Sequence, residues 1–114
     1  MGVAEIALSK GFTRVINSTD NVPQMSNLPT KRFNPESFTI PELDELIRFC
    51  KGHSVLIHCR AGRHRAATTA ACILTRQGRS AKSAVDQVHR YRHNAHIDKK
   101  LYSIVKWVED MQHV

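Results

Sequence analysis

The chain has 114 residues, 41% of them hydrophobic and 24% charged, which is typical of one globular domain over residues 1–114. No apolar run reaches the roughly 18 residues of a membrane span, and residues 1–5 lack a secretory signal, so we expect no transmembrane segment and an intracellular, cytoplasmic protein. Three cysteines without a C-x-x-C pair argue against a disulfide framework or a structural zinc site. The net charge of +7 favours an anionic partner.

The elements can be predicted in chain order from the apolar periodicity and the turn residues. We expect a short helix over residues 2–10, a strand over 12–18, a long loop over 19–38 with an extended piece at 25–28, a helix over 39–50, a strand over 54–58, a helix over 66–77, and helices beginning at Ser80 and Asp98. The last helix should bury Leu101, Ile104, Val105, Val108 and Met111, with Trp107 also packing.

Two features of this pattern determine the predicted fold. The continuous apolar run of residues 54–58 is typical of a strand buried on both faces of a parallel sheet. Thr39 followed by Glu42 forms a capping box, which marks a helix start. The sequence therefore predicts an α/β fold with a small, mostly parallel sheet flanked by helices.

The positive charge is concentrated in one part of the chain. Ten of the 17 cations are arginines, which suit bidentate contacts with phosphate. No acid occurs from residue 55 to residue 85, and six cations do: Arg60, Arg63, Arg65, Arg76, Arg79 and Lys82. Such a run usually forms a solvated surface, but this one contains the strongest chemical motif.

That motif lies at a strand-to-helix junction. The predicted strand ends at His58, and the next helix begins near Arg65. The N–H groups of the turn and of the first helical turn can form an anion-binding nest, in which Gly62 supplies the backbone freedom. Arg65 can bend back and bind two anion oxygens, while the positive field favours a thiolate at Cys59. Cys59 can then attack phosphorus and form a phosphocysteine.

The other cysteines have simpler interpretations. Cys72 and Cys50 are expected to be inert buried thiols, with a transient Cys50–Cys59 disulfide as a minor alternative. A zinc site built from His58, Cys59 and His64 is a further alternative, disfavoured because structural zinc needs four ligands.

His58-Cys59 through Arg65 resembles the H-C-x5-R signature of the cysteine-dependent protein tyrosine phosphatase superfamily, and most of the chain is similar to its dual-specificity branch. The resemblance implies a minimal version of that fold, without the usual N-terminal hairpin. It implies that Cys59 is the nucleophile, that Arg65 binds phosphate and stabilises the transition state, and that no metal or organic cofactor is needed. The substrate-binding residues would be His58, Arg60, Ala61, Gly62, Arg63 and His64.

The loop C-R-A-G-R-x-R is most similar to the loop of lipid-directed members, where additional cations meet extra phosphates. Residues 39–46 also resemble a helix start of the mitochondrial lipid-directed group. Arg60 and Arg63 would therefore suit a polyanionic substrate such as a phosphoinositide, with surface charge as their alternative role. A phosphorylated protein stays open as the other substrate class.

Two positions depart from the family pattern. Ala66 replaces the Ser or Thr whose hydroxyl helps the thiolate leave, so we expect the phosphocysteine to accumulate. The general acid is not at its usual spacing, which leaves Glu36, Asp20 or neither residue, with Glu36 favoured.

The sequence thus predicts a phosphomonoesterase that acts through a phosphocysteine. One alternative is a catalytically impaired module that only binds phosphate. The other is an RNA 5′-phosphatase whose contact patch would be residues 89–93, although an exposed helix end is the favoured explanation of that run. Nucleic acid is therefore not the favoured partner.

Overall fold

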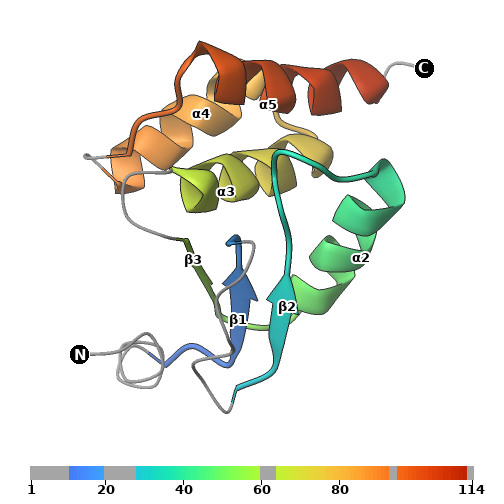
Figure 1. Ribbon diagram of the computed structural model, residues 1–114, viewed down its shortest axis with the longest axis vertical. Coiled ribbons are helices and arrows are strands. Elements are labelled where there is room, and N and C mark those ends of the chain that lie inside the picture. Colours follow the sequence, from blue (N-terminus) through green and yellow to red (C-terminus); the bar gives the residue numbers. More distant parts are fainter. Residues whose placement is uncertain (1–10, 20–27, 60–63, 93–94, 113–114) are drawn as a thin grey trace.

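The computed structural model describes residues 11–19, 28–59, 64–92 and 95–112 (Figure 1). Its elements are β1 (Arg14–Asn17), β2 (Thr30–Arg32), α2 (Ile40–Cys50), β3 (Val55–His58), α3 (Arg65–Arg76), α4 (Ala81–Tyr91) and α5 (Lys99–Met111). The strands lie in the order β2–β1–β3, and both pairs are parallel. Helix α3 lies between the sheet and the helices α4 and α5 (Figure 1). The predicted α/β fold, a small parallel sheet flanked by helices, is confirmed.

The central strand of the described sheet is β1. Its residues Val15 and Ile16 are at most 1% exposed, whereas β3 is half-buried along its whole length. Residues 54–58 therefore contain the predicted strand, but the prediction that it is buried on both faces is wrong. Among the described strands, β3 has one neighbour, because β1 alone pairs with it.

Side-chain caps fix the starts of three helices. Thr39, Ser80 and Asp98 each accept a hydrogen bond from the backbone N–H three residues further on, at 3.3, 3.1 and 2.9 Å respectively. These contacts satisfy N–H groups that a helix start leaves unpaired, which confirms the three predicted starts.

A single core joins the sheet to the helices. Small residues of α3 such as Ala67 and Ala71 are buried in it and allow close packing. Of the residues predicted to be buried in α5, Leu101, Val105 and Val108 are in this core, but Met111 is 39% exposed, because it is the last residue of the helix. Trp107 is 40% exposed and packs edge-on against the ring of Phe38, with 5.5 Å between centroids.

Strand β2 lies within residues 19–38, which were predicted to form a loop. This part of the predicted loop, Thr30–Arg32, is a strand because the backbone of this short, polar segment pairs with β1. Residues 25–27 and the helix predicted over residues 2–10 lie outside the described residues. In the part of the chain that the structure describes, no helix has the length and apolar character needed to cross a membrane.

Candidate active site

Cys59 lies at the carboxyl edge of the sheet, directly after β3, and its free thiol is half-buried. His58 pairs in register with Asn17, and the next N–H of that chain segment, from Ser18, donates to the carbonyl of His58 at 2.8 Å. The ladder therefore continues past β3 and holds the backbone next to Cys59. Burial lowers the pKa of His58, which favours its neutral imidazole. In open α/β sheets this edge is the usual place for a ligand.

The predicted loop residues Arg60, Ala61, Gly62 and Arg63 lie outside the described residues. The described chain resumes at His64, whose φ of 54° is left-handed, a conformation that L residues adopt at some cost. Its imidazole Nδ1 accepts a hydrogen bond from the backbone N–H of His96 at 3.2 Å, and the two rings pack edge to face. The loop that connects α4 to α5 thus contacts the residue directly before Arg65.

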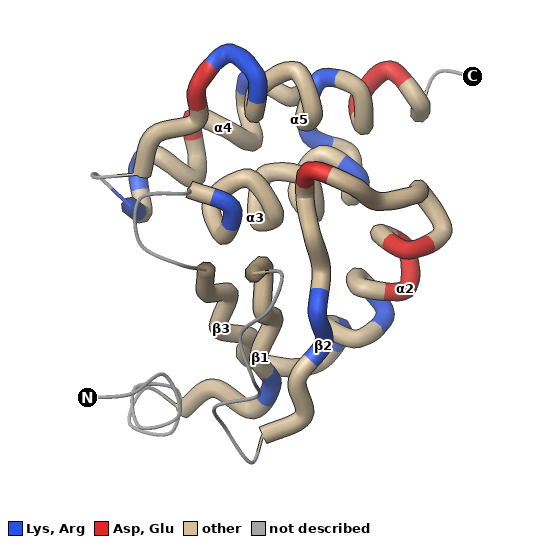
Figure 2. Tube along the Cα trace, in the orientation of Figure 1, with Lys and Arg blue, Asp and Glu red and all other residues tan. Residues whose placement is uncertain are grey.

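Helix α3 begins differently from the other described helices. His64 is its N-cap residue, but the side chain makes no capping hydrogen bond to the first turn. Its carbonyl accepts the usual first helical hydrogen bond from the N–H of Thr68 at 3.2 Å, and a second one from the hydroxyl of Thr68 at 3.0 Å. The first turn of α3 contains no acid and begins with the cation of Arg65 (Figure 2). Uncapped N–H groups and positive charge both favour an anion at this helix start.

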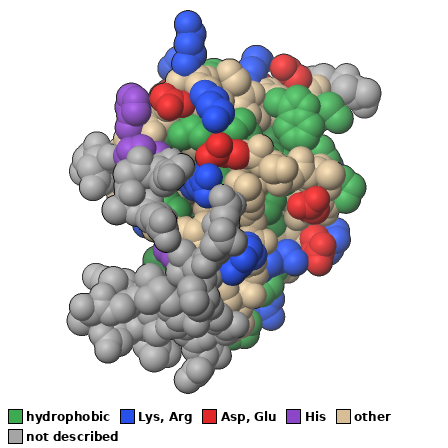
Figure 3. Space-filling model, viewed as in Figure 1, with side chains coloured by type: hydrophobic (Ala, Val, Ile, Leu, Met, Phe, Trp, Pro, Cys, Tyr) green, Lys and Arg blue, Asp and Glu red, His purple; other side chains and the backbone are tan. Residues whose placement is uncertain are grey.

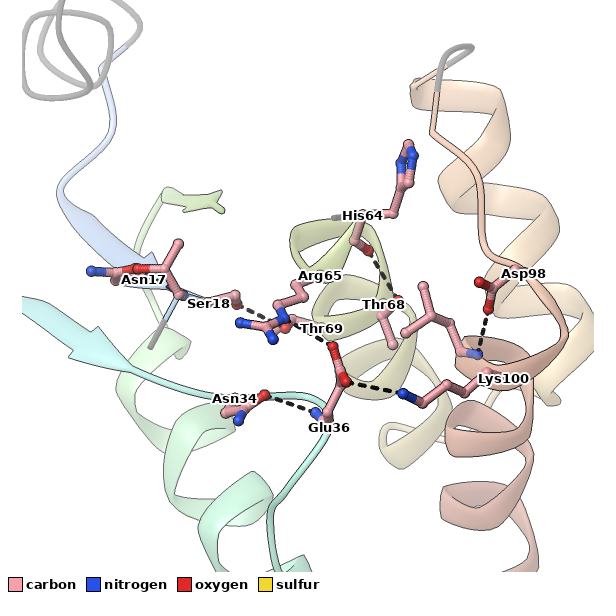
Figure 4. A network of polar contacts seen from close by, with 12 residues as sticks. Asn17, Ser18, Asn34, Glu36, His64, Arg65, Thr68, Thr69, Asp98 and Lys100 are labelled. Carbon is pink, nitrogen blue, oxygen red and sulfur yellow. Dashed lines mark hydrogen bonds and ion pairs between the residues drawn. The ribbon is translucent and has the colours of Figure 1, made fainter. Parts of the chain in front are cut away.

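Arg65 and Glu36 form an ion pair at the start of α3 (Figure 4). The Nε–H of Arg65 donates to Oε1 of Glu36 at 2.9 Å, and Nζ of Lys100 donates to the other oxygen, Oε2, at 3.4 Å. The side chain of Arg65 is only 13% exposed, whereas that of Lys100 is 76% exposed. One carboxylate therefore joins a shielded guanidinium to a solvated ammonium group.

These contacts determine the charge of Glu36. The hydrogen bond from Arg65 lowers the pKa of the carboxyl group, and the charges of Arg65 and Lys100 lower it further against an opposing effect of burial. At neutral pH Glu36 is therefore a carboxylate, which accepts hydrogen bonds and has no proton to donate. The other predicted acid, Asp20, lies outside the described residues.

The hydroxyl groups that follow Arg65 have other partners. Ala66 is buried and carries no hydroxyl. Thr68 donates to His64, and the hydroxyl of Thr69 shares a hydrogen bond of 2.8 Å with the hydroxyl of Ser18 (Figure 4). Both threonine hydroxyls thus form hydrogen bonds within the protein.

The remaining cysteines suit structural roles. Cys72 is fully buried, which raises its pKa to about 12, and burial also raises the pKa of Cys50. Both thiols therefore stay protonated and unreactive. The described residues hold no group of three or more His, Cys, Asp or Glu side chains that could bind a metal ion, so the zinc alternative gains no support.

The described part of the basic run, residues 89–92, lies at the end of α4, and residues 90–92 are exposed. Tyr91 is 81% exposed and borders a hollow of about 380 Å³ with Arg79, Gln87 and Arg90. On the face that Figure 3 shows, acidic and basic side chains are mixed near the centre. His89, Arg90 and Tyr91 form the last turn of α4, and Arg92 is its C-cap residue.

Sequence reasoning missed two contacts of the site. Lys100 lies 64 residues from Glu36 in the chain, and no motif marks it. The contact between His64 and His96 joins residues that are 32 positions apart, and no sequence motif indicates it either. A lysine in the first turn of a helix is common, so no signal could have singled it out.

Comparison with known proteins assigns the family. The family described as "PTP-SAK: Swiss Army Knife protein, DSP-PTPase phosphatase domain" matches residues 5–105, so the chain belongs to this family of phosphatase domains. No curated protein sequence matches the chain significantly.

Solved structures share the fold. Human DUSP28 is 20% identical, with 99% of this chain and 84% of that chain covered and a TM-score of 0.81. PTPMT1 in complex with PI(5)P is 19% identical, with 94% and 82% covered and a TM-score of 0.75. Tk-PTP in the active form is 20% identical, with 96% and 88% covered and a TM-score of 0.71. The fold is thus that of dual-specificity phosphatases.

Proposed function

We propose that the protein is a phosphomonoesterase that acts through a phosphocysteine at Cys59. The observation that carries this proposal is the placement of Arg65: it begins α3 six residues after Cys59, and its shielded guanidinium is held by Glu36 beside an uncapped helix start. A half-buried thiol, a fixed guanidinium and a helix start without a side-chain cap lie at one sheet edge, and this combination suits the binding of a phosphoryl group.

The reaction takes two displacements. The thiolate of Cys59 forms a bond to phosphorus while the bond to the ester oxygen breaks, and the N–H groups of Arg65 stabilise the charge on the phosphoryl oxygens. The leaving oxygen takes a proton from solvent water. Water then attacks the phosphocysteine, which releases inorganic phosphate and restores the thiolate. His58, as a neutral imidazole beside Cys59, would tune that thiolate through hydrogen bonds.

The substrate would bind in the loop from His58 to His64, whose backbone N–H groups hold the phosphoryl oxygens. Arg60 and Arg63 favour a substrate with more than one phosphate, such as a phosphoinositide. The net charge of +7 supports this choice, and the structural neighbour PTPMT1 has been crystallised with PI(5)P. A phosphoprotein is the second substrate class.

Glu36 stays the sequence-predicted general acid, yet its lowered pKa argues against proton donation in the present arrangement. Without a proton donor, the rate depends on how readily the leaving oxygen departs. Aryl phosphates should therefore react much faster than alkyl phosphates.

Hydrolysis of a small aryl phosphate by the wild-type protein and by Cys59→Ser tests the proposal. We expect turnover in the wild type and none in Cys59→Ser, with Cys50→Ser, the other half-buried cysteine, as the matched control. An inactive wild type that still binds phosphate would contradict the enzymatic function and identify a binding module. Assays with a phosphoinositide, a phosphotyrosine peptide and an RNA 5′-triphosphate then compare the substrate classes.

Ala66 gives a kinetic prediction for the same assay. If the hydroxyl missing at this position slows hydrolysis of the phosphocysteine, product release should show a burst equal to the enzyme concentration, followed by a slower linear phase. The variant Ala66→Ser should shorten or remove the burst. A linear trace from the first turnover in the wild type would contradict the idea.

A further inference from the structure

The carboxylate of Glu36 occupies a donor that a bound phosphate would use. Its Oε1 accepts from the Nε–H of Arg65, while its Oε2 accepts from Nζ of Lys100 (Figure 4). A carboxylate and a phosphoryl group both present anionic oxygens to arginine, so the two compete for the same N–H groups. Glu36 thus lies on Arg65 as an anion supplied by the protein itself.

The contacts also indicate how the side chain of Glu36 could move away from Arg65. Each of its two oxygens has a different cation as partner, so loss of the contact with Arg65 leaves the contact with Lys100 in place. The backbone of Glu36 is held separately, because its N–H donates to Oδ1 of Asn34 at 3.0 Å. Exchange therefore requires a rotation of the side chain and no change in the backbone.

We infer that Glu36 is a displaceable internal anion: a phosphoryl group that enters the site takes its place on Arg65, and Lys100 retains the released carboxylate. The inference rests on the proposed function, because it requires that Arg65 binds phosphate. Its consequence is a lower affinity for every anion, inorganic phosphate included, so that the product of hydrolysis leaves more readily.

Substitutions of the two partners of this exchange should act in opposite directions. Glu36→Gln removes the competing charge, so the dissociation constant of inorganic phosphate, measured by calorimetry on the whole chain, should fall about tenfold, which corresponds to about 1.4 kcal/mol. Lys100→Met removes the alternative partner of Glu36, so the same constant should rise about threefold.

A double mutant separates an indirect effect of Lys100 from a direct one. In the background of Glu36→Gln, Lys100→Met should change phosphate affinity no more than Lys99→Met does. Lys99 is the matched control, because it is an exposed lysine on the same turn of α5. A full effect of Lys100→Met without Glu36 would overturn the exchange, since Lys100 would then contact phosphate itself.

The variant Arg65→Met distinguishes failure of this inference from failure of the proposed function. It should abolish phosphate binding; if it binds phosphate as the wild type does, the proposed phosphate site is wrong. If Arg65→Met loses binding but Glu36→Gln weakens it, only the exchange is overturned, and Glu36 is a positioning residue. Circular dichroism of each variant confirms that it is folded.

Discussion

Helix α3 begins and ends with an arginine paired to a carboxylate, and the two pairs differ in geometry. At the carboxyl end, Arg76 donates to both oxygens of Asp44 on α2, from Nε at 2.8 Å and from Nη2 at 3.1 Å. At the amino end, Arg65 donates from Nε to one oxygen of Glu36, and the second oxygen of Glu36 accepts from Nζ of Lys100.

The difference in geometry is what we expect of a structural pair at one end of α3 and, under the proposed function, an exchangeable pair at the other. A bidentate pair uses both carboxylate oxygens and fixes two elements against each other, as Arg76 and Asp44 fix α3 against α2. A pair made through one N–H, with a third charge competing for the carboxylate, can be exchanged at lower cost. Measurements of activity and stability for substitutions at both ends of α3 can test whether the two pairs differ in role.

The largest expected effect is on catalysis. Arg65→Lys should lower kcat/KM for an aryl phosphate about 10²–10³-fold, because an ammonium group does not reproduce the planar set of donors. Arg76→Lys, the same change at the other end of the helix, should leave kcat/KM within about twofold. Equal losses in the two variants would show that Arg65 acts through the stability of α3 instead of through the substrate.

A smaller effect is expected on the free energy of unfolding. It should be greater at the carboxyl end of α3 than at the amino end. Asp44→Ala should lower the free energy of unfolding by about 1 kcal/mol, since it removes a bidentate but partly exposed pair. Glu36→Ala should change it less, because it loses one hydrogen bond from Arg65 and a longer contact, at 3.4 Å, with the exposed Lys100. Chemical denaturation of both variants measures this, and the reverse order would remove the distinction between the two pairs.

The smallest effect is a dependence on pH. The hydrogen bond from Arg76 lowers the pKa of Asp44, so this pair stabilises the folded protein above the usual carboxyl pKa and loses that contribution as the pH falls through the lower folded-state value. The difference in Tm between the wild type and Asp44→Asn should therefore be full at pH 6 and shrink below about pH 4. A difference that stays constant down to pH 3 would contradict the pairing.

Local patterns in the sequence predicted the parts of the fold that neighbouring residues determine. The caps at Thr39, Ser80 and Asp98 were identifiable because each one acts on an amide three residues away. The start of α3 near Arg65 was identifiable for a similar reason, since an apolar run, a glycine and a run of helix-forming residues follow one another there in the sequence.

Features that depend on distant contacts could not be predicted in the same way. Strand β2 is short and polar, and it is a strand because β1 pairs with it. The placement of β3 with a single described neighbour depends on strand order, which its apolar run does not encode. The pairing of Glu36 with Arg65 and Lys100 spans 29 and 64 residues, so Glu36 could be noticed as a carboxylate but its partners could not.

The left-handed backbone of His64 has a consequence for which side chains that position tolerates. A φ of 54° is accessible to glycine without penalty, to asparagine at little cost, and to β-branched residues only under strain. Variation there should therefore run toward residues with small or locally hydrogen-bonding side chains, whatever their charge. The shape of the backbone, rather than the chemistry of an imidazole, would be the property that a selection for phosphate binding preserves.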